Sequence, residues 1–81
     1  MKPLSELGRG EYGYIVDMKD SNITKQLFDL GCFPGDLIRV ETNLPERDFI
    51  TFRCHRHRYH LSRPNAEKVI TNTVSFHFCM N

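Results

Sequence analysis

The segment spanning residues 23–36 constrains the fold more than any other part of the sequence. Its apolar residues recur at helical spacing and are followed at once by glycine: Ile23, Leu27, Leu30, Gly31. This pattern predicts a short amphipathic helix over residues 23–30, with Gly31 ending it in the left-handed conformation. Pro34 cannot continue a helix, and the pair Pro34-Gly35 predicts a tight turn. The chain must therefore reverse sharply from this helix into the next element.

Short strand patterns surround the helix. Residues 13–18, 36–41, 49–54, 57–61 and 69–71 are rich in β-branched and aromatic side chains or alternate in polarity, which predicts about five strands. Ser62 and Pro64 are typical of a short helical turn before the last strand. So many strands in so few residues favour a small, strongly bent antiparallel barrel, because closing a sheet removes exposed edges. The predicted fold class is mainly β.

The length of 81 residues allows one domain and excludes a large enzyme with a cleft between lobes. We expect residues 1–71 to form the barrel and residues 72–81 to form a C-terminal tail. In the tail, Val74, Phe76 and Phe78 alternate with polar residues. Two interpretations stay open, because the tail can extend the last strand or pair with a second copy of the chain.

The cysteines and the apolar segments indicate in which cellular compartment the protein is expected. Three cysteines, at positions 32, 54 and 79, form no C-x-x-C pair and leave one unpaired in any disulfide framework. No stretch reaches the roughly 18 apolar residues of a membrane span, and the first residues contain no secretory apolar region. We therefore expect a cytoplasmic protein with free thiols that does not span a membrane.

Charge is distributed unevenly. Residues 1–48 carry six Lys and Arg against nine Asp and Glu, whereas residues 49–81 carry five against one, together with all four His. A basic half is compatible with a nucleic-acid partner, and small barrels do bind RNA through basic, aromatic faces. Five cations are few for such a surface. A solvated sheet face is therefore the preferred interpretation, and binding of nucleic acid is the alternative.

The order of these elements resembles the FeoA family, small cytoplasmic proteins of bacterial ferrous iron transport. The resemblance covers residues 4–71. It rests on the opening Leu-Ser-Glu-Leu with Gly-Glu and Gly-Tyr-Ile-Val, on the central Gln-Leu-Phe-Asp-Leu-Gly-Cys-Phe-Pro-Gly-Asp, and on the closing Arg-Tyr-His-Leu-Ser and Ala-Glu-Lys-Val-Ile. This chain departs from the family's pattern at the hairpin turn. The family commonly carries glycine there, whereas this chain has His55-Arg56. Because a two-residue primed turn without glycine is strained, we expect a wider loop here.

The resemblance implies an SH3-like barrel and a non-enzymatic accessory role in ferrous iron uptake. It also implies binding or regulation of the cytoplasmic GTPase part of FeoB, the membrane protein that carries ferrous iron. It implies no cofactor.

The central segment also suggests where a partner binds. We expect Leu27, Leu30 and Phe33 to close one end of the barrel, with Gly31, Pro34 and Gly35 as structural turn residues. The hypothesis for the partner surface brings the helix and this turn close to the loop 43–48. Its candidate contact residues are Leu27, Leu30, Cys32, Phe33 and Leu44.

The histidine-rich hairpin is a candidate for a metal site, since Cys and His ligate transition metals. Strand alternation turns Cys54 and His57 inward, but His55 and His60 outward beside arginines. One ion is not easily ligated from both faces of a sheet, so no metal site is predicted. Cys54 and His57 are the weak candidates for a metal-responsive module. As a nucleophile and base, the same pair lacks an orienting third group.

Overall fold

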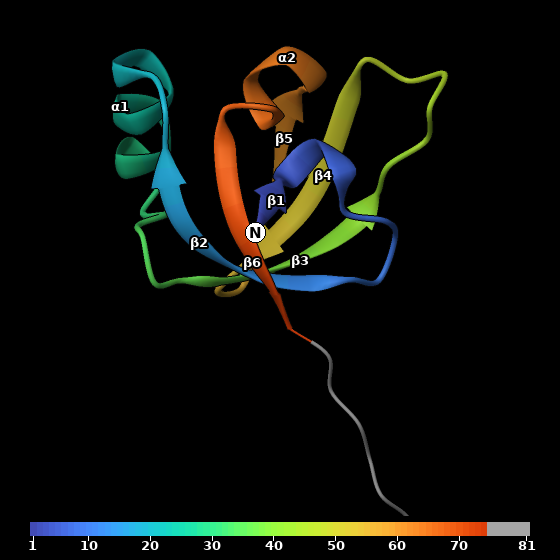
Figure 1. Cartoon of the computed structure of the whole chain (residues 1–81), viewed down its shortest axis with the longest axis horizontal. Coiled ribbons are helices and arrows are strands. Elements are labelled where there is room, and N and C mark those ends of the chain that lie inside the picture. Colours follow the sequence, from blue (N-terminus) through green and yellow to red (C-terminus); the bar gives the residue numbers. More distant parts are fainter. Residues whose placement is uncertain (75–81) are drawn as a thin grey trace, which may run out of the picture.

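A computed structural model describes residues 1–74. Its strands are β1 (Lys2–Pro3), β2 (Tyr12–Met18), β3 (Leu37–Thr42), β4 (Phe49–Cys54), β5 (His57–Ser62) and β6 (Val69–Val74). Three helical segments connect them: the 3-10 turn η1 (Leu4–Glu6), α1 (Ser21–Asp29) and the short α2 (Arg63–Ala66). All strand pairings are antiparallel, in the order β1-β6-β2-β3-β4-β5. Figure 1 shows the sheet bending strongly, with α1 beside β2 and α2 near β5. The mainly β class is confirmed, with six strands instead of about five.

The first and last described strands lie next to each other, because β6 is inserted between β1 and β2. Lys2 pairs with Thr71, and the Thr71 hydroxyl donates a 2.8 Å hydrogen bond to the Lys2 carbonyl. Thr71 is fully buried, so this bond satisfies a polar group that would otherwise be costly to bury. The two described ends of the domain are therefore paired with each other at one edge of its sheet.

Alternation along the strands produces the core. Ile50, Phe52 and Cys54 of β4 point inward as predicted, and each is at most 1% exposed. The helices contribute further buried side chains, among them Ile23 and Leu27 of α1. The remaining core residues come from β2, β3, β5 and β6, from both short helical segments and from two connecting segments: Leu4, Leu7, Ile15, Met18, Cys32, Ile38, Val40, Leu61, Ala66, Val69. One continuous apolar core is thus enclosed by the bent sheet.

Helix α1 begins two residues earlier than the apolar pattern predicts. Asp20 caps it, since its carboxylate accepts a 2.7 Å hydrogen bond from the Asn22 amide. The same carboxylate forms a 3.0 Å ion pair with Lys68, just before β6. Lys68 is the main cause that lowers the pKa of Asp20 from its usual value. The cap therefore also ties the helix to the last strand.

The β4–β5 hairpin contradicts the expectation of a wider loop. Cys54 pairs with His57, so His55 and Arg56 alone form the turn. His55 takes the positive φ of 59° that such a turn requires at its first central residue. Histidine is one of the few side chains that adopt this conformation comparatively often, which explains how the turn forms without glycine.

Strand β6 continues through Val74, three residues past the predicted end of the barrel. Residues 72–74 of the predicted tail 72–81 thus belong to β6, and the rest of it, with Phe76, Phe78 and Cys79, lies outside the described residues. Neither helix within residues 1–74 is long and apolar enough to cross a membrane.

Candidate functional site

Three apolar side chains are exposed together where α1 ends, and we call them the Phe33 patch: Phe28, Leu30, Phe33. Their exposed fractions are 43%, 38% and 45%. The rings of Phe28 and Phe33 lie against each other, with centroids 4.8 Å apart. Paired aromatic rings that stay accessible to solvent are typical of protein interaction sites. The patch is therefore a candidate docking surface.

The turn after α1 holds Phe33 in place. Gly31 adopts a φ of 82° as predicted, and the Cys32 amide donates a 2.8 Å hydrogen bond back to the Leu27 carbonyl. The carboxylate of Asp36 accepts a 2.9 Å hydrogen bond from the Phe33 amide. Gly35 also has a positive φ, of 97°, which confirms the predicted tight turn. These bonds thus fix the backbone of the turn at Phe33.

Two of the predicted contact residues are not available on this surface. Leu27 and Cys32 are each 0% exposed, because they face the core from the inner side of α1 and of its turn. Leu30 and Phe33 were expected to close the barrel, yet they are 38% and 45% exposed. Phe28 belongs to the patch but was not among the predicted contact residues. Its place one position after Leu27 turns it away from the buried stripe.

Leu44 lies elsewhere. Figure 1 shows the β3–β4 loop, residues 43–48, on the opposite side of the molecule from α1. The hypothesis that this loop and the helix form one surface is therefore wrong. Leu44, 43% exposed, instead lines an open groove of about 470 Å³ together with Phe49, Thr51 and His60. This groove, which we call the Leu44 groove, is a second and separate candidate surface.

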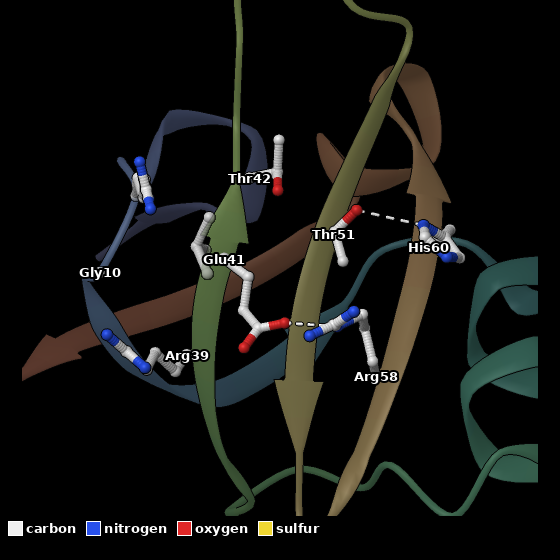
Figure 2. A pocket seen from close by; sticks show the side chains of 9 residues that line it. Gly10, Arg39, Glu41, Thr42, Thr51, Arg58 and His60 are labelled. Atoms are coloured by element: carbon white, nitrogen blue, oxygen red, sulfur yellow. Dashed lines mark hydrogen bonds and ion pairs between the residues drawn. The ribbon is translucent and has the colours of Figure 1, made fainter.

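The outer face of β3, β4 and β5 carries a row of arginines. Arg39 pairs with Arg53 across the first two strands, and Arg53 pairs with Arg58 across the next two. Like charges placed opposite each other destabilise a sheet. Glu41, at a bulge in β3, relieves the repulsion through ion pairs of 3.1 Å to Arg53 and 2.6 Å to Arg58. Figure 2 shows its carboxylate directed at Arg58.

These contacts reduce the charge that the basic face offers to a ligand. Arg53 and then Arg58 lower the pKa of Glu41 from its usual value, so Glu41 stays ionised between them. Arg63 donates hydrogen bonds to the backbone carbonyls of Leu44 and Arg47. Arg53, Arg58 and Arg63 therefore all have hydrogen-bond partners within the protein. Tyr59 also donates its hydroxyl to a backbone carbonyl and packs against the core. This weakens the nucleic-acid alternative.

The weak metal candidates are not brought together as predicted. Cys54 is buried, but His57 is exposed, with its ring tilted against that of Tyr59. Cys54 lies instead beside Asp36 and His55, and the ligand atoms of these three residues are all within 4.8 Å of one another. Burial raises the pKa of both described cysteines, that of Cys32 to about 12, and thus keeps them as thiols. Neither has the depressed thiol pKa of a nucleophilic cysteine.

The sequence matches the family model of the FeoA domain over residues 2–72. No curated protein sequence matches the chain closely enough to count as a relative.

Solved structures share the fold. The crystal structure of an iron uptake regulatory protein (FeoA) is 27% identical, covers 90% of this chain and 96% of its own, and has a TM-score of 0.79. A FeoA of Stenotrophomonas maltophilia, crystallised with zinc and described as a procaryotic SH3 domain protein, is 21% identical. It matches over 89% of this chain and 91% of its own, with a TM-score of 0.78. A manganese-dependent transcriptional repressor is 14% identical over 90% of this chain but 36% of its own, with a TM-score of 0.83. The architecture is therefore SH3-like.

Proposed function

Because this chain belongs to the FeoA family and has an accessory role in ferrous iron transport, we propose that it is non-enzymatic and binds the cytoplasmic GTPase part of a FeoB-type transporter. Its place of action is then the cytoplasm. The docking surface is the Phe33 patch. The observation that carries the choice is the contact between the tilted rings of Phe28 and Phe33, both exposed, with the Phe33 amide bonded to Asp36 in the turn.

The arrangement of the patch suits binding. Interface energy concentrates in a few large side chains near the centre of the contact, and aromatic residues are prominent among them. Phe28 and Phe33 present such side chains, and Leu30 extends the apolar area beside them. The bond from the Phe33 amide to the Asp36 carboxylate already fixes the backbone at Phe33 before a partner arrives. A pre-ordered contact loses less conformational entropy on binding.

A pull-down with the purified cytoplasmic domain of the FeoB-type transporter tests the proposal. Phe33→Asp places a charge at the centre of the patch, and we expect binding to fall at least about tenfold, as for a hot-spot residue. Leu44→Asp is the matched control, since it introduces the same charge at an equally exposed apolar position in the Leu44 groove. Circular dichroism and thermal unfolding of both variants check that each is folded.

Each outcome is informative. Loss of binding in Phe33→Asp alone supports the Phe33 patch. Loss in Leu44→Asp alone moves the docking surface to the Leu44 groove and overturns this assignment. Absence of binding by the unaltered protein, measured with the transporter domain in each nucleotide state, contradicts the proposed partner.

A further inference from the structure

Three side chains with different metal-binding chemistry meet where the β4–β5 hairpin approaches the turn before β3. They are Asp36, Cys54 and His55, whose ligand atoms are all within 4.8 Å of one another. Cys54 ends β4, His55 is the first residue of the hairpin turn, and Asp36 directly precedes β3. The pairing of Cys54 with Ile38 brings these segments side by side. The cluster thus joins residues 18 and 19 positions apart in the sequence.

The turn conformation explains how two consecutive residues share one site. In a regular strand, Cys54 and His55 point to opposite faces. His55 has left the strand and has a φ of 59°. Its Nε2 atom lies 3.2 Å from Oδ2 of Asp36. Strand alternation therefore does not keep the His55 side chain away from that of Cys54.

We propose that Asp36, Cys54 and His55 bind one divalent transition-metal ion, Zn²⁺ or Fe²⁺, with the fourth position left to water. Two ligands that are each about 2.1 Å from a tetrahedral ion lie about 3.4 Å apart. The separation of the Asp36 and His55 atoms is already close to this value. The sulfur of Cys54 lies within 4.8 Å of both atoms, so it needs an approach of at most about 1 Å to reach the ion.

The donor set selects the kind of ion. A thiolate and an imidazole favour Zn²⁺ and Fe²⁺ and disfavour Mg²⁺ and Ca²⁺, which prefer oxygen ligands. The thiolate and the carboxylate carry two negative charges that balance a divalent cation. On binding, Cys54 releases its thiol proton to solvent. His55 coordinates through an Nε2 atom without a proton, so the ion replaces the hydrogen bond between His55 and Asp36.

The surroundings of the cluster are consistent with binding. Asp36 is held by the Phe33 amide, at 2.9 Å, and such outer contacts orient metal-binding carboxylates. Cys54 is buried, whereas the side chains of Asp36 and His55 are 23% and 57% exposed. An ion can therefore reach Asp36 and His55 from solvent. Burial and the neighbouring Asp36 charge raise the pKa of Cys54, and a bound cation offsets both effects.

Titration of the full chain with Zn²⁺ by calorimetry, under oxygen-free reducing conditions, tests the site. Co²⁺ is a second probe, because a thiolate ligand produces a charge-transfer absorption band. We expect one ion per chain at micromolar affinity and a thiolate–Co²⁺ band. Three variants remove one ligand each: Asp36→Asn, Cys54→Ser and His55→Asn. Asn is chosen at position 55 because it tolerates positive φ. Each should weaken Zn²⁺ binding at least about tenfold.

Control variants separate this site from other ligands of the chain. His57→Ala removes an exposed neighbour, and Cys79→Ser removes the thiol that lies outside the described residues. Both should keep the affinity and the Co²⁺ band. If the unaltered chain binds no Zn²⁺, or if His55→Asn and Asp36→Asn bind as tightly as it does, the proposal is overturned. Loss of the band in Cys79→Ser overturns it as well. His55 is exposed, so its variant stays informative if Cys54→Ser does not fold.

Discussion

The hydroxyl of Tyr59 donates a 2.9 Å hydrogen bond to the backbone carbonyl of Leu30. This bond joins β5 to the residue that follows α1, across 29 positions of sequence. Burial of the phenol raises the pKa of Tyr59, so the hydroxyl keeps its proton and remains a donor. The end of α1, and with it the Phe33 patch, is therefore fastened to the far side of the sheet.

Removing that hydroxyl should loosen the end of α1. In Tyr59→Phe, the ring still packs on the core but the Leu30 carbonyl loses its donor. We expect faster amide hydrogen exchange at Gly31 and Cys32, whose amides bond within the same turn. Tyr14→Phe is the control, since Tyr14 is exposed and distant along the sheet order. Equal exchange rates at Gly31 in both variants would contradict the proposed tie.

Gly31→Ala should destabilise the protein by about 1–2 kcal/mol, because alanine is strained in the left-handed conformation. A Cβ atom at Gly31 meets no atom within 4 Å, so the cost comes from the backbone alone. Asn tolerates this conformation better, and Gly31→Asn should therefore lose less. Urea unfolding measures both. A loss as large for Asn as for Ala would show that strain at φ is not the cause.

Phe52→Ala should cost about 3–5 kcal/mol of the free energy of unfolding, because it empties the centre of the core. Phe52 is 1% exposed, whereas Phe49 of the same strand is 57% exposed. The same substitution at Phe49 should change the free energy of unfolding by no more than about 0.5 kcal/mol. Chemical unfolding of the two variants compares inner and outer faces of β4 directly. Similar losses would contradict the face assignment.

Glu41 should make stability depend on pH. Its pKa is lowered in the folded protein, chiefly by Arg53, from an unfolded value near 4.5. The carboxylate therefore stabilises the fold at pH values above 4.5, and this contribution is lost as the pH falls through the lowered folded pKa. Glu41→Gln should be less stable than the unaltered protein at neutral pH, and the difference should vanish in acid.

Urea unfolding across this pH range measures the effect. Glu46→Gln is the control, because Glu46 is exposed and makes no ion pair within residues 1–74. If Glu41→Gln is still less stable than the unaltered protein in acid, the ion pairs are not the cause of the difference in stability.

The elements that follow local rules were predictable from the sequence. The amphipathic stripe located α1, and Gly31 and Gly35 have the predicted turn conformations. Alternation in β4 assigned its buried face correctly. Strand β1 was missed because two residues carry no periodicity, and it exists only through pairing with β6.

The candidate site was predicted only in part, since surfaces depend on tertiary placement. Leu30 and Phe33 are exposed, but burial of Cys32 depends on how the turn folds back onto the sheet. The distance between Leu44 and α1 depends on the path of the sheet, which spacing does not reveal. His55 lies in a turn and not in a strand, so strand alternation does not predict the direction of its side chain. Its turn conformation brings the side chain to Asp36.

The position of β6 has a consequence for synthesis in the cell. Strand β2 needs β6 as its neighbour on one side, and β1 pairs with β6 in the sheet order. During translation, residues 1–62 can therefore form α1 and the β2–β5 meander while the partner of both N-terminal strands is still missing. The sheet is completed only after residue 74 has left the ribosome. Until then the edge of β2 remains open to other chains, so the nascent protein is most prone to aggregation just before its last strand is inserted.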